Sequence, residues 1–310
     1  MALAEFNLIK QFFTRPAKRE GTQLSVGDDC ALLAVPEGFE LAITVDTMVE
    51  SVHFFADVDP RHLGHKLLAV NLSDLASMGA EPVAVTLALT MPKVDALWLD
   101  DFAQGLFALA DKYAVDLIGG DTTSGPLTLT IQAMGLVPRL HALHRSAAKV
   151  GDLIYVTGRI GDAGLGLKIK QGYVSDNGLP SLERFNMPEP RVAEGLAIRS
   201  VANACVDISD GLAADLGHIL EKSSVGARLD YQEIPVSDAV MEYINDTRDW
   251  RMPLVAGDDY ELCFTVAPEN VEKLNIDCTC IGIIEQEQGL RLEREGRVSD
   301  FVVGGFEHFS

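Results

Sequence analysis

The feature that most constrains this chain is a short stretch that follows an apolar segment, Thr44-Val45-Asp46-Thr47. Residues 41–45 are apolar and partly β-branched, which predicts a strand packed in a core. Asp46 stands at the expected end of that strand. A carboxylate held there by rigid backbone still reaches solvent or a ligand, so we interpret Asp46 as a candidate metal ligand. The alternative is a side chain that caps a turn.

Similar acidic clusters recur along the chain beside apolar segments or glycines. They are Gly27-Asp28-Asp29, Asn71-Leu72-Ser73-Asp74, Gly119-Gly120-Asp121-Thr122-Thr123, Asp207-Ile208-Ser209-Asp210-Gly211 and Gly257-Asp258-Asp259-Tyr260-Glu261. Carboxylates, carbonyls and water are the ligands that Mg²⁺ prefers. The repetition therefore favours a shared cation chemistry over a series of unrelated turns.

Length and charge limit the classes of protein to which this chain can belong. The chain has 310 residues, is 47% hydrophobic and carries a formal net charge of −21. This length predicts about two domains with a sizeable core. The acidic balance argues against a nucleic-acid partner, because no basic stripe is present to bind the phosphate backbone. A phosphate ligand would need divalent cations between itself and the protein.

The sequence also predicts a cytoplasmic protein. No apolar run is long enough to span a membrane, and the first residues lack the pattern of a signal peptide. The five cysteines are an odd number without CxxC spacing, which indicates a reduced compartment.

One predicted helix carries an acid on its apolar face. Over residues 60–78, Leu63, Leu67, Val70 and Asp74 recur at helical spacing. Asp74 has no cation one turn before or after it, so it needs another partner. We consider a metal ion and, alternatively, a helix-cap contact elsewhere.

The rest of the first half reads as an α+β domain. We expect a strand over 83–91, a helix over 95–113 and a short strand over 115–118 that runs into Gly119-Gly120-Asp121. Paired glycines let a backbone approach a ligand closely, although an ordinary turn is the alternative. A strand over 127–137 follows, with apolar and polar residues in alternation.

The second half begins after a polar, basic segment, and we predict domains over 1–138 and 139–310. Its expected elements are a strand over 153–157, helices over 188–204 and 212–222, and a strand within 255–266.

Four residues of the second half and one of the first each have two possible roles. Asp207 and Asp210 flank Ser209 as in a loop that wraps a hydrated cation, although Ser209 or Asp210 could cap the following helix. Arg145 could pair with a nucleotide phosphate or be a solvated linker residue. His53 is read as packed or capped before it is read as a ligand.

The motifs that are absent narrow the chemistry. There is no P-loop, protein-kinase signature, zinc-ligand spacing or nucleophile elbow. The remaining carboxylates suit phosphoryl transfer in which several Mg²⁺ ions bridge protein acids to phosphates. Phe306 is either a core residue or an aromatic platform for a ligand ring.

Taken together and in this order, the motifs resemble those of the bacterial thiamine-monophosphate kinase family. The motifs that carry the resemblance are Gly27-Asp28-Asp29-Cys30-Ala31, Thr44-Val45-Asp46-Thr47, Val52-His53-Phe54, residues 69–80, Gly119-Gly120-Asp121-Thr122, Asp207-Ile208-Ser209-Asp210-Gly211-Leu212 and Gly257-Asp258-Asp259-Tyr260-Glu261-Leu262.

The resemblance implies two domains of the type found in aminoimidazole ribonucleotide synthetase. The first would have a mixed or antiparallel sheet with helices, and the second would be an α/β sandwich. It also implies a homodimer in which the N-terminal sheets pair into a barrel. The implied reaction is in-line transfer of a phosphoryl group from ATP to thiamine monophosphate, which yields thiamine diphosphate.

The resemblance assigns roles residue by residue. The implied Mg²⁺ ligands are Asp29, Thr44, the Val45 carbonyl, Asp46, Asp74, Asp121, Asp207 and Asp210, of which Asp46, Asp74, Asp121 and Asp210 would be catalytic. Gly120, Asp121, Arg145 and Ser209 would contact ATP. His53, Asp258 and Phe306 would contact thiamine monophosphate. Family members often carry Glu in place of Asp258 and Tyr or Trp in place of Phe306.

Two alternatives stay open. One is a sister activity, aminoimidazole ribonucleotide or selenophosphate synthesis. The selenophosphate branch needs a reactive Cys near its N-terminus, and Cys30 lies within the acidic motif instead. The other is a non-catalytic sensor of Mg-nucleotide.

Overall fold

The computed structural model describes residues 5–176 and 180–302 and divides the chain into two compact units. Unit 1 comprises residues 1–75 and 80–140, and unit 2 comprises residues 76–79 and 141–310. Each unit has its own sheet and its own buried core.

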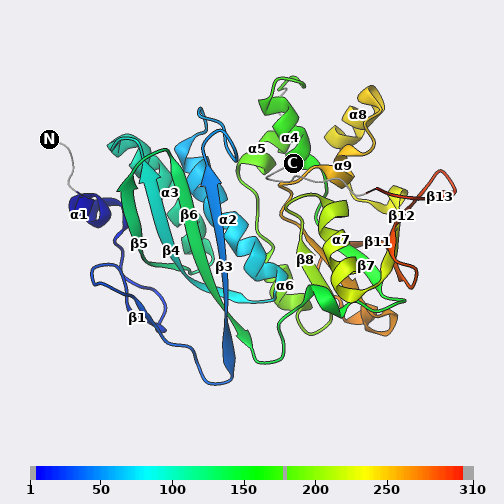
Figure 1. Ribbon diagram of the computed structural model, residues 1–310, viewed down its shortest axis with the longest axis horizontal. Helices are drawn as coiled ribbons and strands as arrows, with labels where there is room; N and C mark the ends of the chain where they lie inside the picture. Colours follow the sequence, from blue (N-terminus) through cyan, green and yellow to red (C-terminus); the bar gives the residue numbers. More distant parts are fainter. Residues whose placement is uncertain (1–4, 177–179, 303–310) are drawn as a thin grey trace. The chain divides into compact units, whose positions relative to one another are not determined.

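Unit 1 is built on a four-stranded mixed sheet in the order β3-β6-β4-β5 (Figure 1). β4 runs parallel to β5, and the other two pairs are antiparallel. Helices α2 and α3 lie side by side behind the sheet. The bounds of these elements are β3 (Phe39–Val49), α2 (Pro60–Ser77), β4 (Glu81–Met91), α3 (Ala96–Lys112), β5 (Asp116–Ser124) and β6 (Thr128–Pro138).

A short N-terminal segment precedes this sheet. It comprises α1 (Glu5–Leu8), the π-helical turn η1 (Ile9–Phe13), and the two-stranded sheet of β1 (Thr22–Leu24) and β2 (Leu32–Leu33). Asp116 holds it in place, because this buried carboxylate accepts from the backbone N–H of Lys18 at 2.8 Å and of Arg19 at 3.1 Å.

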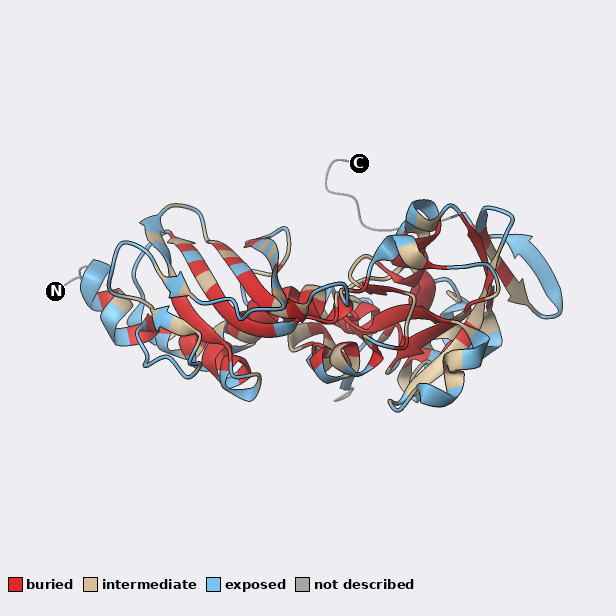
Figure 2. Cartoon of the chain, turned by 90° about the horizontal axis from the view of Figure 1, so that it is seen from below, coloured by how far each residue is buried: buried red, intermediate tan, exposed pale blue. Residues whose placement is uncertain are grey.

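Burial along the strands of unit 1 shows that one face of its sheet is more covered than the other. In β6, the fully buried Leu129, Ile131 and Ala133 alternate with more exposed residues, as the sequence pattern predicts. Figure 2 shows strands on which buried and less buried residues alternate in this way. β3 is an outer strand, and the side chains of Ile43 and Val45 are each 58% exposed.

Unit 2 is built on a seven-stranded sheet in the order β13-β12-β9-β11-β7-β10-β8. Its core packs helix α7 against the strands through residues such as Val206, Leu216, Ile219 and Ile281. The strands are β7 (Leu153–Thr157), β8 (Ala204–Asp207), β9 (Gly226–Asp230), β10 (Leu262–Val266), β11 (Cys278–Glu285), β12 (Gly289–Arg294) and β13 (Arg297–Asp300). The α-helices are α4 (Asp162–Lys170), α5 (Pro180–Asn186), α6 (Val192–Ile198), α7 (Leu212–Ser223), α8 (Asp238–Thr247) and α9 (Met252–Val255), and the 3₁₀ turns are η2 (Arg145–Ala147), η3 (Tyr231–Glu233) and η4 (Pro268–Lys273).

Most predicted elements are confirmed, and one helix predicted in unit 2 is wrong in extent. The helix predicted over 188–204 is helical only over α6, because Pro188 and Pro190 precede it and Ala204 begins β8. The strand expected within 255–266 is confirmed as β10, which begins at Leu262 after a loop that contains the glycine and the aspartates. Among residues 5–176 and 180–302, no helix has both the length and the apolar character that a membrane crossing requires.

Candidate active site

Three of the predicted ligands meet between β3 and α2. Thr44 and Asp46 are two residues apart on β3 and therefore share one face of the strand. Asp74 lies on α2, and the Thr44 hydroxyl donates a hydrogen bond to its Oδ2. Asp74, the acid predicted on the apolar face of the helix, thus has Thr44 of β3 as a partner.

The two carboxylates of this group repel each other. Burial, together with the charge of Asp74, raises the pKa of Asp46 from 3.8 to about 7. No donor hydrogen-bonds the Asp46 carboxylate in the described part of the chain. A charge that is partly buried beside a like charge is stabilised when a cation binds between them.

The sequence pattern predicts that the strand ends at Asp46, and this prediction is wrong. β3 continues to Val49, paired with β6 through Asp46 opposite Ile131 and Thr47 opposite Thr130. Asp46 remains in the strand because the ladder to β6 outweighs the weak strand preference of aspartate. The turn-capping alternative for Asp46 is therefore wrong.

Gly119, Gly120 and Asp121 also belong to a strand and not to a loop. They lie in β5, where Gly120 pairs with Leu87 of β4. A Cβ atom on Gly120 would lie 1.9 Å from the Leu87 carbonyl oxygen, so β4 itself requires a glycine there. The exposed Asp121 lies on the strand at the opposite edge of the sheet from β3, about 14 Å away at ~4.8 Å per strand.

Two further predicted ligands of unit 1 are Asp29 and the backbone carbonyl of Val45. Asp29 is exposed in the turn between β1 and β2, where its N–H donates to Asp28 Oδ1 at 2.8 Å. The Val45 side chain points away from Thr44 and Asp46, as alternation along a strand requires.

His53 lies in the turn that follows β3. Its Nδ1 accepts a hydrogen bond from the backbone N–H of Val49 at 3.0 Å, so its ring caps the end of the strand. In the neutral ring the proton then resides on Nε2, which makes that nitrogen a donor. The capped reading is confirmed, and it is compatible with a contact from Nε2 to a ligand.

The second candidate site is the loop of residues 207–211 between β8 and α7. Asp207 is 3% exposed at the end of β8, and Ser209 and Asp210 are half-buried. Neither Ser209 nor Asp210 caps the helix, since the N-cap residue of α7 is Gly211 and no side chain bonds there. The helix-cap alternative is therefore wrong for both.

Sequence reasoning missed the residue that holds this loop, Asp215 in the first turn of α7. Its Oδ2 accepts from the backbone N–H of Ser209 at 2.9 Å and of Asp210 at 3.0 Å. Burial raises the pKa of Asp215 to about 7, while the nearby charge of Arg145 acts in the opposite direction. Arg145 therefore lies close to this loop. The missed signal was an acid on the apolar stripe of Leu212 and Leu216.

The segment of residues 257–261 packs directly on the same loop. The Asp258 N–H donates to the Ser209 carbonyl at 2.8 Å, and a Cβ atom on Gly257 would lie 2.2 Å from that oxygen. Asp258 has a positive φ of 68°, and its Oδ1 accepts from the Tyr260 hydroxyl at 3.0 Å. The predicted substrate contact Asp258 and the predicted nucleotide contact Ser209 are thus neighbours within unit 2.

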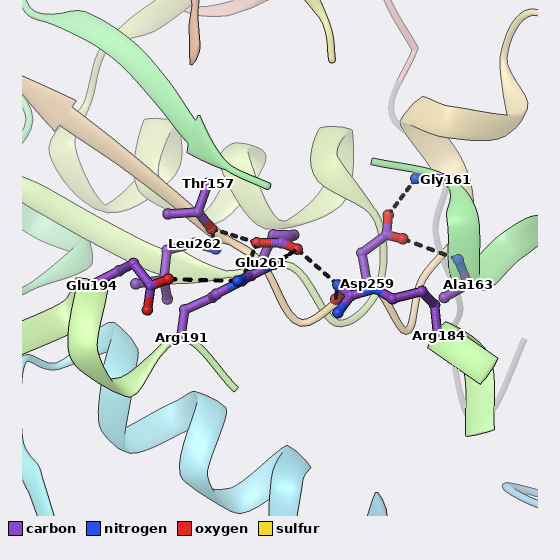
Figure 3. A network of polar contacts seen from close by, with 9 residues as sticks. All are labelled: Thr157, Gly161, Ala163, Arg184, Arg191, Glu194, Asp259, Glu261 and Leu262. Atoms are coloured by element: carbon purple, nitrogen blue, oxygen red, sulfur yellow. Dashed lines mark hydrogen bonds and ion pairs between the residues drawn. The ribbon is translucent and has the colours of Figure 1, made fainter. Parts of the chain in front are cut away.

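Two buried acids anchor this segment (Figure 3). Asp259 accepts from the backbone N–H of Gly161 at 2.8 Å and of Ala163 at 3.3 Å, at the start of α4. Burial raises the pKa of Asp259 to about 8. Glu261 accepts from Thr157 Oγ1 at 2.6 Å, and both Arg184 and Arg191 form ion pairs with it. Asp259 therefore fixes the backbone between Asp258 and Tyr260, and Glu261 fixes it directly after Tyr260.

Two further findings concern the predicted aromatic contact and the predicted metal ligands. Phe306, the predicted aromatic contact, lies outside them. Within residues 5–176 and 180–302, no group of three or more His, Cys, Asp or Glu side chains is arranged to hold a metal ion. The predicted ligands instead fall into a unit 1 group and a unit 2 group.

The fold and these acidic sites define a two-domain protein of the AIR synthase related type. The family model of the AIR synthase related protein N-terminal domain matches residues 27–137, and that of the C-terminal domain matches residues 149–294. The predicted fold class is therefore confirmed. Over its full length, the chain is 45% identical to thiamine-monophosphate kinase of Salmonella typhimurium, of which it covers 99%. The chain belongs to the thiamine-monophosphate kinase family, and it is an enzyme.

Solved structures agree with this assignment. The crystal structure of thiamine-monophosphate kinase from Stenotrophomonas maltophilia K279a matches with a TM-score of 0.86 and 43% identity, over 96% of this chain and 99% of that one. A structure described as AaThiL complexed with AMPPCP and TMP matches with a TM-score of 0.81 and 27% identity, over 89% of each chain.

Proposed function

We propose that this enzyme transfers a phosphoryl group from ATP to thiamine monophosphate and so forms thiamine diphosphate. Family membership and the AaThiL complex with AMPPCP and TMP support the two substrates. The observation in the chain itself that carries the proposal is the Asp46–Asp74 pair, whose mutual repulsion calls for a cation.

The residues present fit Mg²⁺. Asp46 and Asp74 offer carboxylate oxygens and Thr44 offers a hydroxyl, which is the oxygen set that Mg²⁺ prefers. Several ions would be held by the residues that the family resemblance assigns: Asp29, Thr44, the Val45 carbonyl, Asp46, Asp74, Asp121, Asp207 and Asp210. Bound there, Mg²⁺ would neutralise charge between these acids and the phosphates.

The chain's own residues would bind and orient the two substrates. Ser209, Asp121, Gly120 and Arg145 would contact ATP, and the cation of Arg145 suits a phosphate. His53 would donate from Nε2 to thiamine monophosphate, because Nδ1 is already an acceptor. Asp258 and Phe306 would contact the same substrate.

The reaction needs no covalent nucleophile from the protein. In direct in-line transfer, a phosphate oxygen of thiamine monophosphate attacks the γ-phosphorus of ATP, and the bond from that phosphorus to the β,γ-bridging oxygen breaks, which releases ADP. Positioning and charge neutralisation then carry the catalysis.

We further propose a homodimer formed through the sheet of unit 1. Ile43 and Val45 lie on an outer strand with 58% of each side chain exposed. Exposed apolar residues on an edge strand favour association with a second copy. The five cysteines are all free thiols, which supports a reducing, cytoplasmic location.

The deciding experiment is an assay of ADP release with Mg-ATP and purified protein. It compares thiamine monophosphate with thiamine and with the aminoimidazole-pathway substrate. We expect ADP only with thiamine monophosphate, together with thiamine diphosphate in the product. ADP with another acceptor alone would assign a sister activity, and no ADP with any acceptor would favour the sensor.

A further inference from the structure

Asp215 is a buried carboxylate to which the predicted reaction gives no role. It is 3% exposed and lies in the first turn of α7. A single oxygen, Oδ2, accepts from two successive backbone N–H groups, at 2.9 Å from Ser209 and 3.0 Å from Asp210. Bonds from backbone N–H to a carboxylate are charge-assisted and stronger than neutral ones.

Together with two bonds from the backbone of residues 258–260, these bonds hold two successive peptide groups in place. The peptide between Ile208 and Ser209 donates its N–H to Asp215, and its carbonyl accepts from the Tyr260 N–H at 2.8 Å. The next peptide, between Ser209 and Asp210, donates its N–H to Asp215 and accepts from the Asp258 N–H at 2.8 Å. Both peptide planes around Ser209 are therefore held on both sides.

We propose that Asp215 is a positioning residue for the phosphoryl transfer. It fixes the backbone from which the Ser209 and Asp210 side chains extend toward nucleotide and Mg²⁺. This inference rests on the proposed function, in which Ser209 contacts ATP and Asp210 holds an ion. Residues that orient metal ligands through hydrogen bonds commonly change metal affinity or activity about 10–100-fold when replaced.

Asp152 provides a matched control for the general cost of altering a buried acid. It is 2% exposed in the same unit and accepts from the Lys149 N–H at 2.9 Å and Thr265 Oγ1 at 3.2 Å. Thr265 pairs with Ala204, at the end of β8 that lies away from Asp207. A change at Asp152 therefore disturbs the sheet without reaching the 207–211 loop.

The test compares Asp215→Ala, Asp215→Asn and Asp152→Asn in two assays. Calorimetric binding of AMPPCP with Mg²⁺ gives a readout that does not need turnover, and thiamine diphosphate formation gives the rate. Melting temperatures report folding. We expect Asp215→Ala to weaken Mg-AMPPCP binding by about 10–100-fold. Asp215→Asn should have a smaller effect, because its amide oxygen can still accept from both N–H groups. Asp152→Asn should change binding less than about 2-fold even where it lowers the melting temperature.

The results separate this inference from the proposed function. Wild-type binding without thiamine diphosphate formation would refute the proposed reaction, while the binding comparison would still judge Asp215. Wild-type affinity in Asp215→Ala, or an equal loss in the Asp215 and Asp152 variants at the same loss of melting temperature, would overturn the positioning role. If Asp215→Ala does not fold, Asp215→Asn against Asp152→Asn decides. A neutral amide oxygen forms weaker bonds than a carboxylate, so Asp215→Asn should still weaken Mg-AMPPCP binding by more than the about 2-fold limit expected for Asp152→Asn, and equal affinities would overturn the positioning role. A wild-type protein that does not bind Mg-AMPPCP would overturn both proposals.

Discussion

Replacing Asp46 by Asn should stabilise the metal-free protein at alkaline pH. The pKa of Asp46 rises from 3.8 to about 7 because the carboxyl is largely buried and lies near Asp74. At 1.36 kcal/mol per pH unit, this rise corresponds to an upper limit of about 4 kcal/mol for charging the folded site. Since Asp46 keeps some contact with water, we expect a measured gain of about 1–2 kcal/mol at pH 8.

The sign of the pH dependence follows from linkage. A carboxyl whose pKa is higher in the folded than in the unfolded state stabilises the fold fully below pH 3.8. That contribution is lost as the pH rises through about 7, where the folded carboxyl ionises. The Asn variant lacks this titration, so its advantage over the wild type should be small at pH 5 and largest at pH 8.

Magnesium should make the wild type more stable than the Asp46→Asn variant, which reverses the order expected without metal. In the wild type, an ion that binds the native state alone raises the free energy of unfolding. Asp46→Asn removes one proposed ligand, so it should gain less from Mg²⁺ and should not turn over, although its fold is intact. Near wild-type turnover in this variant would refute the metal assignment.

Denaturant unfolding in EDTA and in saturating Mg²⁺, at pH 5 and pH 8, measures these free energies. Glu40→Gln is the control, because Glu40 is an exposed acid on the same strand. A variant that is less stable than the wild type at pH 8 in EDTA would refute the repulsion argument. An advantage of the same size at both pH values would refute the titration.

Three further predictions concern other parts of the chain. Phe306→Ala should raise the KM for thiamine monophosphate more than the KM for ATP in steady-state assays, and an equal rise in both would indicate a structural role. Glu261→Ala should lower the free energy of unfolding by about 3–5 kcal/mol, because it leaves Arg184 and Arg191 without their buried partner; a loss below about 1 kcal/mol in urea titrations would contradict this. Val45→Glu should shift the mass measured by light scattering from dimer to monomer, and an unchanged dimer would exclude this face as the interface.

The position of Asp74 shows how far sequence reasoning reached. An acid on the apolar stripe of a helix predicts a partner elsewhere, and the structure supplies Thr44 and Asp46 on β3. Helical periodicity is a local property, so it predicted both ends of α2 to within two residues. It could not tell which strand α2 faces, because that depends on packing.

The course of β3 and β5 shows where sequence reasoning failed. The polar residues after Val45 and the paired glycines before Asp121 are typical of turns. Both segments nevertheless continue as strands, because β6 and β4 offer them a complete hydrogen-bond ladder. Strand ends are decided by neighbouring strands, which the local pattern does not contain.

The buried and half-buried acids of this chain separate into two kinds that spacing alone does not distinguish. Asp215 and Asp259 each accept backbone N–H groups, and Glu261 accepts from two arginines, so the protein itself satisfies them. Asp46 is different, since its one electrostatic neighbour that raises the pKa is another carboxylate. An acid of the first kind holds backbone in place, whereas the ionised form of an acid of the second kind is stabilised by a cation from outside the chain. This difference in partners, and not the recurrence of aspartates, is the reason to assign Asp46 to ion binding and Asp215 to positioning.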